Sequence, residues 1–301
     1  PEVDAVLGTT SYGDIVKALN EVQAGHVFQE FRDINELPED SGRRVLTTGG
    51  HFGYLKIAEG CDKHCTYCII PSLRGSFRSV PEERLLAQAE YMASQGVKEL
   101  ILVAQETTVY GTDLYGRKTL HILLKKLCQI RGIRWIRVLY CYPEEIYDEL
   151  IQVMKEEKKI CNYLDLPIQH ASDRILKRMG RRTTRKQLTD IITKLRREIP
   201  DIVLRTSLIT GFPGETQEDH EELMEFVDEM EFDRLGVFTY SPEEGTPAET
   251  MEGQVPEEVK EERRDEIMSL QQEISLEKGS ERIGQELLVM IEGKVSGESA
   301  Y

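Results

Sequence analysis

The sequence predicts an α/β fold in which six parallel strands and their covering helices form an open or partial barrel of the TIM type. Short β-type runs alternate with helical stretches from Tyr54 onward, and such alternation is typical of a parallel sheet covered by helices. The 301 residues, of which 40% are hydrophobic, suffice for one large domain. Six strands are two fewer than a closed eight-stranded barrel contains.

The elements follow in order along the chain. The predicted strands span residues 54–58, 99–104, 135–140, 163–167, 203–209 and 235–240. Amphipathic segments at residues 82–95, 120–130, 144–157, 184–198 and 216–230 carry apolar residues at three- and four-residue spacing, which indicates helices. Crossover loops of parallel folds gather at the carboxyl ends of the strands, so we expect the functional site there.

Shorter segments flank this core. Residues 1 to about 46 contain an apolar run at 3–7, a helical stretch near 12–22 and an acidic, turn-rich segment around 37–42, which is too little to fold alone. Pro256 opens a long charged helix that runs to about Lys278, and Gly284 begins a new β element with a strand-like run at 287–291. Because the chain starts at Pro1 and this last run stops near the terminus, we expect the chain to be a fragment.

Charge and hydropathy restrict the partners. The chain has 38 basic and 54 acidic residues, a formal net charge of −16. This balance disfavours a nucleic-acid-binding surface, which needs clustered Lys and Arg, and attracts a basic protein instead. No apolar stretch approaches the roughly 20 residues that span a bilayer, and no charged-then-apolar leader opens the sequence. We therefore expect a cytoplasmic protein with no membrane contact.

Three of the six cysteines cluster. Cys61, Cys65 and Cys68 form a C-x3-C-x2-C pattern directly after the first predicted strand. A 4Fe-4S cluster ordinarily takes four thiolates, so three leave one iron open, by the same logic that separates open catalytic metal sites from closed structural ones. The motif thus predicts a cluster whose free iron binds a substrate.

The alternative is a structural zinc site with His64 or His51 as the fourth ligand. His64 adjoins Cys65, so both reach one tetrahedral ion only through an awkward turn, and structural zinc sites usually come as two spaced pairs. The remaining cysteines, Cys128, Cys141 and Cys161, lie in apolar contexts and are expected to be small buried hydrophobes.

The cysteine motif and its placement resemble the radical S-adenosylmethionine superfamily, which implies a partial (β/α)6 barrel core, here at residues 47–283. In that family the aminocarboxylate of S-adenosylmethionine chelates the unique iron, and an injected electron splits the sulfonium into methionine and a 5′-deoxyadenosyl radical. The resemblance places Tyr67, just before the third cysteine, near the adenine. Ordinary packing of its ring under the loop is the alternative.

The resemblance also implies cofactor contacts at later strand ends. Gln105 and Glu106 match the position that recognises the ammonium of S-adenosylmethionine by a charge-assisted contact. Solvated loop residues are the alternative for these two. Gln169 and Ser172 resemble polar contacts to the ribose or methionine. His170, between them, is expected to be a structural hydrogen-bonder rather than a proton carrier.

The fifth strand matches the family's G-x-I-x-G-x-x-G-E pattern at Gly211, Gly214 and Glu215, except that Ser207 replaces the first glycine. Glycines permit a tight turn and close approach of the backbone to a ligand. The resemblance lets Arg205 pair with the methionine carboxylate, and a salt bridge from helix to sheet is the equal alternative.

Longer stretches, at residues 54–61, 70–75, 105–111, 166–172 and 240–246, resemble methylthiotransferases, and among these the RimO type. This resemblance implies methylthiolation of the β-carbon of an aspartate in a small-subunit ribosomal protein, with an electron donor such as flavodoxin or ferredoxin. Two uses of S-adenosylmethionine follow, one as methyl donor and one as radical source.

The family has further domains that this chain does not contain in full. An amino-terminal domain supplies three more cysteines for a second 4Fe-4S cluster, and a carboxyl-terminal TRAM-like β-barrel docks the substrate. Residues 1–46, which lack cysteine, resemble the tail of the first domain and a linker, and residues 284–301 the start of the second. We expect this fragment to bind one cluster and cleave S-adenosylmethionine, without nucleic-acid contact. The alternatives are a MiaB-type transfer-RNA methylthiotransferase and a non-catalytic zinc scaffold.

Overall fold

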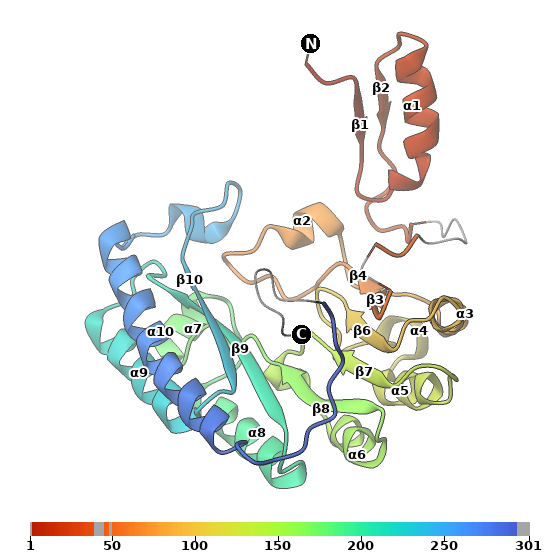
Figure 1. The fold of residues 1–301 in the computed structure, drawn as a ribbon. Coiled ribbons are helices and arrows are strands. Elements are labelled where there is room, and N and C mark those ends of the chain that lie inside the picture. The colour runs from red at the N-terminus through yellow and green to blue at the C-terminus, as the bar shows by residue number, and fades with distance from the viewer. Residues whose placement is uncertain (1, 39–44, 48–49, 294–301) are drawn as a thin grey trace.

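The computed structural model describes residues 2–38, 45–47 and 50–293. Its main sheet has six strands in the order β10-β9-β8-β7-β6-β3, and every neighbouring pair is parallel. The strands are β3 (Phe52–Lys56), β6 (Glu99–Val103), β7 (Trp135–Val138), β8 (Ile160–Asp165), β9 (Val203–Thr210) and β10 (Arg234–Thr239). Within this sheet the strands lie side by side in their order along the chain, and the sheet curves with helices on its outer side (Figure 1). The predicted partial barrel is confirmed.

The outer layer consists of α3 (Glu82–Ser94), α5 (Leu120–Cys128), α6 (Asp148–Glu156), α8 (Arg185–Glu198), α9 (Gln217–Met230) and α10 (Glu257–Ser280). Capping boxes fix two helix starts, where Thr184 pairs with Gln187 and Thr216 with Asp219. The predicted helix 144–157 is instead split into the 3-10 turn η2 (Pro143–Glu145) and α6, because Ile146 is extended between them. The short helix α7 (Asp173–Arg178) was not predicted.

The two faces of the sheet differ in polarity. Along β9, Leu204 and Leu208 are fully buried under the helices, whereas Arg205 and Ser207 on the opposite, inner face are partly exposed. Other charged groups on this inner face form pairs, such as Arg137 Nε with Glu99 Oε1 at 2.6 Å. The inner face is therefore polar and accessible, which suits a binding cavity rather than a second hydrophobic core.

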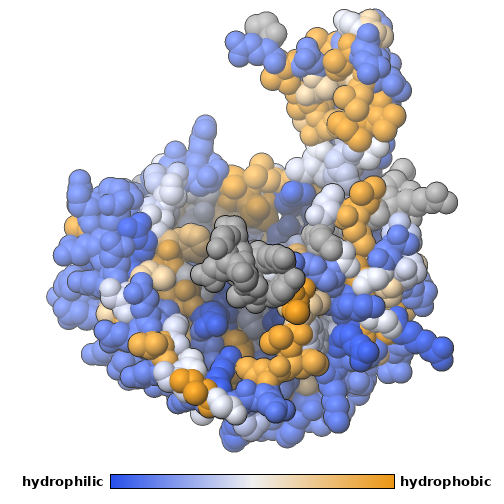
Figure 2. Space-filling view, in the orientation of Figure 1, coloured by the Kyte–Doolittle hydropathy of each residue, from blue (hydrophilic) through white to orange (hydrophobic). Residues whose placement is uncertain are grey.

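The amino-terminal residues form a small unit of β1 (Ala5–Leu7), η1 (Tyr12–Asp14), α1 (Ile15–Gln23) and β2 (Phe28–Glu30), with β1 and β2 parallel. It stands apart from the barrel in Figure 1 and shows apolar side chains in Figure 2. The predicted apolar run and helix are both present. Part of the predicted acidic turn, at residues 39–42, lies outside the described residues.

The carboxyl-terminal flank corrects one prediction. α10 extends as expected, but the β element predicted from Gly284 is wrong for the described residues 284–293, which contain no strand. Leu287, Leu288, Val289 and Ile291 are 60% to 85% exposed, because no neighbouring strand covers them. Within the described residues, no helix is both long and apolar enough to cross a membrane.

Candidate active site

The three clustered cysteines lie on one loop between β4 (Ala58–Glu59) and α2 (Ile70–Arg74). β4 pairs with the short antiparallel strand β5 (Arg78–Ser79), which closes the loop at its base. Gly60 has a φ of +75°, and a Cβ there would lie 2.1 Å from the Ser76 carbonyl oxygen. Only glycine therefore allows the two arms of the loop to approach, and the Cys61 N–H donates to the Gly75 carbonyl at 3.2 Å.

The far side of the loop is held by the segment that ends α7. The Thr66 N–H donates to the Met179 carbonyl at 2.9 Å, and the Thr66 hydroxyl donates to the Arg178 carbonyl at 2.8 Å. The loop backbone is thus fixed at both ends before any cofactor binds, which keeps the cysteines in place for ligation.

The thiols themselves share a poorly solvated environment. Cys61 and Cys65 are buried, and Cys68 is partly exposed. Burial raises the pKa of Cys61 to about 11, and Glu106, Cys65 and Cys68 add to the increase. Burial and the charge of Cys65 likewise raise the pKa of Cys68. The three thiols therefore interact electrostatically, and a bound group with positive metal ions would relieve their mutual repulsion as thiolates.

No three His, Cys, Asp or Glu side chains within the described ranges are arranged to hold one metal ion, and these ranges include the cysteine loop and His51. A 4Fe-4S cluster asks for something different, because each thiolate binds a separate iron. Three interacting thiols on a fixed loop fit that donor set.

Two polar side chains, Gln105 and Glu106, follow β6, and Glu106 is close enough to Cys61 to act on its thiol. Glu106 is 1% exposed, and its Oε1 accepts a hydrogen bond from the Thr108 N–H at 2.9 Å. Its Oε2 has no hydrogen-bond partner, and neither has Oε1 of Gln105. Leaving buried acceptors unsatisfied is costly, so the site has two acceptors ready for a donor such as an ammonium group. Burial raises the pKa of Glu106 to about 7, against hydrogen bonds from Thr108 and the charge of Lys63.

This pKa gives a stability prediction for Glu106→Gln. The folded chain holds the Glu106 proton up to about pH 7, against an ordinary value of 4.5, so the stability that this neutral carboxyl provides is lost as the pH rises through 7. Glutamine never ionises, so the variant should exceed the parent in stability at pH 8 by on the order of 3 kcal/mol. Urea denaturation of the cofactor-free chain checks this. A stability difference that is equal at pH 5 and pH 8 would contradict it.

We did not predict a second group of side chains, which lies around Cys65. The Tyr142 hydroxyl lies 3.8 Å from Cys65 Sγ, and the Tyr142 ring contacts two cations, with Lys63 Nζ at 4.9 Å and Arg181 Cζ at 4.3 Å from its centroid. Lys63 also approaches Glu106 Oε2 at 3.9 Å and pairs with Glu145. Tyr142 follows β7, so the rule that strand ends carry the site would have found it.

The comparisons with known proteins agree with this geometry. A family model described as the Radical SAM superfamily matches residues 55–227. The chain is 63% identical over all 301 residues to the ribosomal protein uS12 methylthiotransferase RimO of Lachnoclostridium phytofermentans, covering 68% of that protein. A protein of the same name from Clostridium perfringens is 52% identical over 299 residues, which are 99% of this chain and 67% of that protein. The chain belongs to the RimO family of radical S-adenosylmethionine methylthiotransferases.

A solved structure supports the fold of this RimO-family chain. The radical S-adenosylmethionine methyltransferase TsrM from Kitasatospora setae, with cobalamin and a [4Fe-4S] cluster bound, matches with a TM-score of 0.55 and 17% identity over 66% of this chain and 38% of that one. At this identity the match shows the fold alone. The superfamily's cofactors, a 4Fe-4S cluster and S-adenosylmethionine, are those that the cysteine motif predicts, so the predicted family, enzyme class and cofactors are confirmed.

Two residues that the resemblance assigned to S-adenosylmethionine have partners within the RimO-family fold itself. Ser172 is 2% exposed, and its hydroxyl donates to Asp219 Oδ1 at 2.7 Å, which joins α7 to α9. The Glu215 side chain is fully buried, with Oε1 2.8 Å from Arg263 Nη1. His170 is also fully buried, and its Nε2 lies 3.5 Å from Glu215 Oε2. These contacts hold the strand-end loops together, and Ser172 and Glu215 remain predicted cofactor contacts that are already engaged in the fold.

The two glycines also have structural reasons. Gly211 has a φ of +68°, and a Cβ there would lie 2.1 Å from Lys260 Cγ. Gly214 has a φ of +82°, and its Cβ would lie 3.0 Å from Arg178 Cζ. The absent side chains therefore make room for α10 and α7, and both glycines remain predicted positions of close backbone approach to the cofactor.

The remaining predicted cofactor contacts differ in how far the fold already engages them. Arg205 Nη1 donates to Asp165 Oδ1 at 2.5 Å, so its salt bridge joins β9 to β8 and is not the helix-to-sheet bridge given as its alternative. Gln169 has a left-handed φ of 72°, and its N–H donates to the Ser207 carbonyl at 3.0 Å. The Tyr67 ring packs edge-on against Phe212, with centroids 6.4 Å apart, beneath the cysteine loop. These four remain predicted cofactor contacts, with Arg205 and Tyr67 already engaged in the fold.

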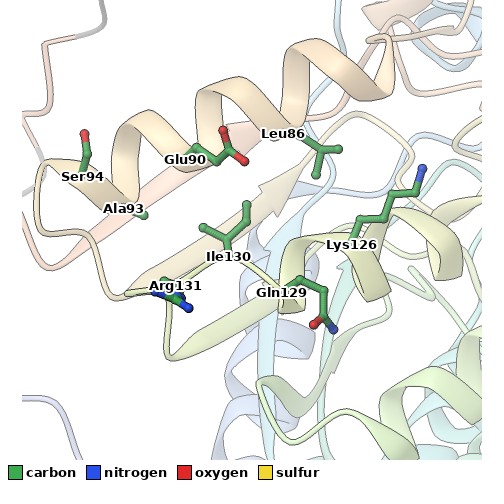
Figure 3. Close-up of a pocket in the computed structure, with 8 residues that line it drawn as sticks. All are labelled: Leu86, Glu90, Ala93, Ser94, Lys126, Gln129, Ile130 and Arg131. Carbon is green, nitrogen blue, oxygen red and sulfur yellow. The ribbon is translucent and has the colours of Figure 1, made fainter.

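Another groove lies elsewhere, between α3 and α5 on the outer helical layer (Figure 3). None of the predicted site residues lines it, and its lining is a mixture of aliphatic and charged side chains: Leu86, Glu90, Ala93, Ser94, Lys126, Gln129, Ile130 and Arg131. It is separate from the strand ends and plays no part in the candidate site.

Proposed function

We propose that this chain is the radical core of an enzyme that methylthiolates the β-carbon of an aspartate in ribosomal protein uS12. The observation that carries the proposal is the cysteine loop, where three thiols interact with one another and with Glu106, whose Oε2 has no hydrogen-bond partner in the described residues. We infer the substrate from the name of the relatives, which are up to 63% identical to this chain. A net charge of −16 favours a basic protein over a nucleic acid as partner.

In this proposal each side chain has a definite task. Cys61, Cys65 and Cys68 hold the cluster, and Glu106 with Gln105 binds the ammonium of S-adenosylmethionine. When bound, the cluster supplies the electron that cleaves the cofactor. The protein's own task is to orient and to exclude water, because a radical formed in contact with solvent undergoes side reactions. We place the substrate carboxylate on the polar inner face of the barrel, beside the predicted cofactor contacts Ser207 and Gln169.

The rest of the function requires more than residues 47–283, which we assign to the radical core. We assign residues 1–46 to the tail of a preceding domain that holds a second cluster, and 284–301 to the start of a TRAM-like barrel. A flavodoxin or ferredoxin is the proposed electron donor. Since the substrate is a ribosomal protein, we place the reaction in the cytoplasm.

Mass spectrometry separates this proposal from its rival. A strain that lacks the gene should yield uS12 without the methylthio group, while bulk transfer RNA keeps its methylthiolated adenosine. Loss of the transfer-RNA modification with intact uS12 would instead establish the MiaB-type activity. Anaerobic reconstitution should give about four irons per chain. A protein that binds zinc but no iron would contradict both the uS12 and the transfer-RNA methylthiotransferase.

A further inference from the structure

One buried cation near the cysteine loop has no carboxylate within ion-pair distance among the described residues. Arg181 follows α7 and is 6% exposed. Its guanidinium lies over the Tyr142 ring, and Nη2 donates to the Pro167 carbonyl at 3.0 Å. The other two nitrogens, Nε and Nη1, have no hydrogen-bond partner. Burying a charged group with unsatisfied donors is unfavourable unless a partner compensates it.

No carboxylate supplies that compensation. In the part of the chain that the structure describes, no Asp or Glu oxygen lies within 4.0 Å of the Arg181 guanidinium, and Glu144 acts on it only from a greater distance. Lys63, on the same Tyr142 ring, is the opposite case, because Glu145, Glu144 and Glu106 all surround it. Of these two cations, Lys63 is neutralised and Arg181 is not.

Arg181 lies near Cys65, which would be anionic as a thiolate ligand of the cluster. Its backbone adjoins the cysteine loop, since the Met179 carbonyl accepts from the Thr66 N–H at 2.9 Å. A Cβ on Gly180 would lie 3.3 Å from the His64 carbonyl oxygen. Tyr142, on which Arg181 stacks, reaches to 3.8 Å from Cys65 Sγ. The uncompensated cation therefore lies beside the thiol that would carry negative charge as a cluster ligand.

We propose that Arg181 is the residue that sets the reduction potential of the cluster, by holding one uncompensated positive charge beside Cys65. Three thiolates make the ligated cluster anionic, and its reduction adds further negative charge. A fixed cation in a poorly solvated place stabilises the reduced form more than the oxidised one, because attraction grows with charge and is weakly screened there. Arg181 thus makes the electron easier to deliver. The inference rests on the proposed function, since it requires the cluster.

The test is a redox titration of the reconstituted 301-residue chain, followed by electron paramagnetic resonance. Arg181→Gln and Arg181→Met remove the charge with a polar and an apolar side chain, and Arg181→Lys keeps it. Arg182→Gln is the matched control, because it removes the same charge from the next residue, which is exposed. Iron and sulfide contents are measured first for every variant, so that a change in potential is not confused with loss of cluster.

At the potential where the parent is half reduced, we expect the ratio of reduced to oxidised cluster to fall at least tenfold in the neutral variants. This corresponds to a midpoint about 59 mV lower for one electron. Arg182→Gln should change the ratio less than twofold, and Arg181→Lys should lie between the parent and the neutral variants.

Three results would reject the inference about Arg181 or the proposed function, and each result points to a different one of these failures. If a neutral variant keeps its full iron content and the parent's potential, Arg181 does not set the potential. If neither neutral variant binds a full cluster while Arg182→Gln does, Arg181 acts only in assembly, and the inference is equally rejected. If the parent chain itself binds no cluster, the proposed function fails first.

Discussion

Replacing Cys61, Cys65 or Cys68 with alanine abolishes the reductive formation of 5′-deoxyadenosine, while Cys128→Ala retains it. The loop offers three thiols for a cluster that ordinarily takes four thiolates, so the loss of any one leaves too few ligands to hold it. The measurement is the yield of 5′-deoxyadenosine after anaerobic reconstitution and reduction, with iron content determined on the same samples. We expect the product to fall below detection in each single variant.

Cys128 is a demanding control because it resembles the ligands in burial but not in position. It ends α5 on the outer layer, and burial raises its pKa to about 11, as it does for Cys61. Its replacement by alanine removes one sulfur atom from the core and no ligand. Cleavage that persists in the triple variant Cys61→Ala/Cys65→Ala/Cys68→Ala would contradict the assignment of the cluster to this loop.

The sequence predicted the barrel well because its signals are local and repeated. Each strand is a short apolar run, and each covering helix has a buried stripe, as in α8, where Leu188, Ile192 and Leu195 are buried. The prediction of a β element after Gly284 was wrong because strand formation also depends on a partner that is not local. A strand needs a partner for its backbone, and Leu287–Ile291 meets none in the described residues.

The site was predictable only where the chemistry lies on one contiguous segment. The cysteine motif is local, and Gln105 with Glu106 follows a recognisable strand. Arg181 and Tyr142 are 39 residues apart in the numbering, and only the packing of α7 against the loop after β7 brings them to the cysteines. For Glu215, the motif at a strand end gave no sign of its partner Arg263, which comes from a distant helix.

Removing that partner is the second large effect that we expect. Arg263→Met should destabilise the chain by about 3–5 kcal/mol, the usual result of leaving a buried charge without its counter-ion. Arg263 Nη1 lies 2.8 Å from Glu215 Oε1, and the two side chains are 7% and 0% exposed. Glu215 Oε2 also accepts from the Phe212 N–H at 3.2 Å. The measurement is urea denaturation at pH 7.

The pH dependence tests whether the loss is electrostatic. Burial acts to raise the pKa of Glu215, but hydrogen bonding to His170 and the charge of Arg263 outweigh it and lower the pKa below its ordinary value. Glu215 therefore stabilises the fold above the pKa of an unfolded glutamate, and this contribution is lost as the pH falls. In Arg263→Met the carboxylate loses its cation, so the difference from the parent should shrink toward acidic pH.

A second variant separates the charge from the packing. Glu215→Gln combined with Arg263→Met removes both ions, so most of the stability that the single Arg263→Met change loses should return, apart from what the altered packing costs. Equal destabilisation in the single and double variants would mean that the Arg263 stem, not its charge, holds α10 against the strand-end loops. Recovery would mean instead that the glutamate after the β9 glycines is kept for this ion pair, which fixes the last helix beside the site.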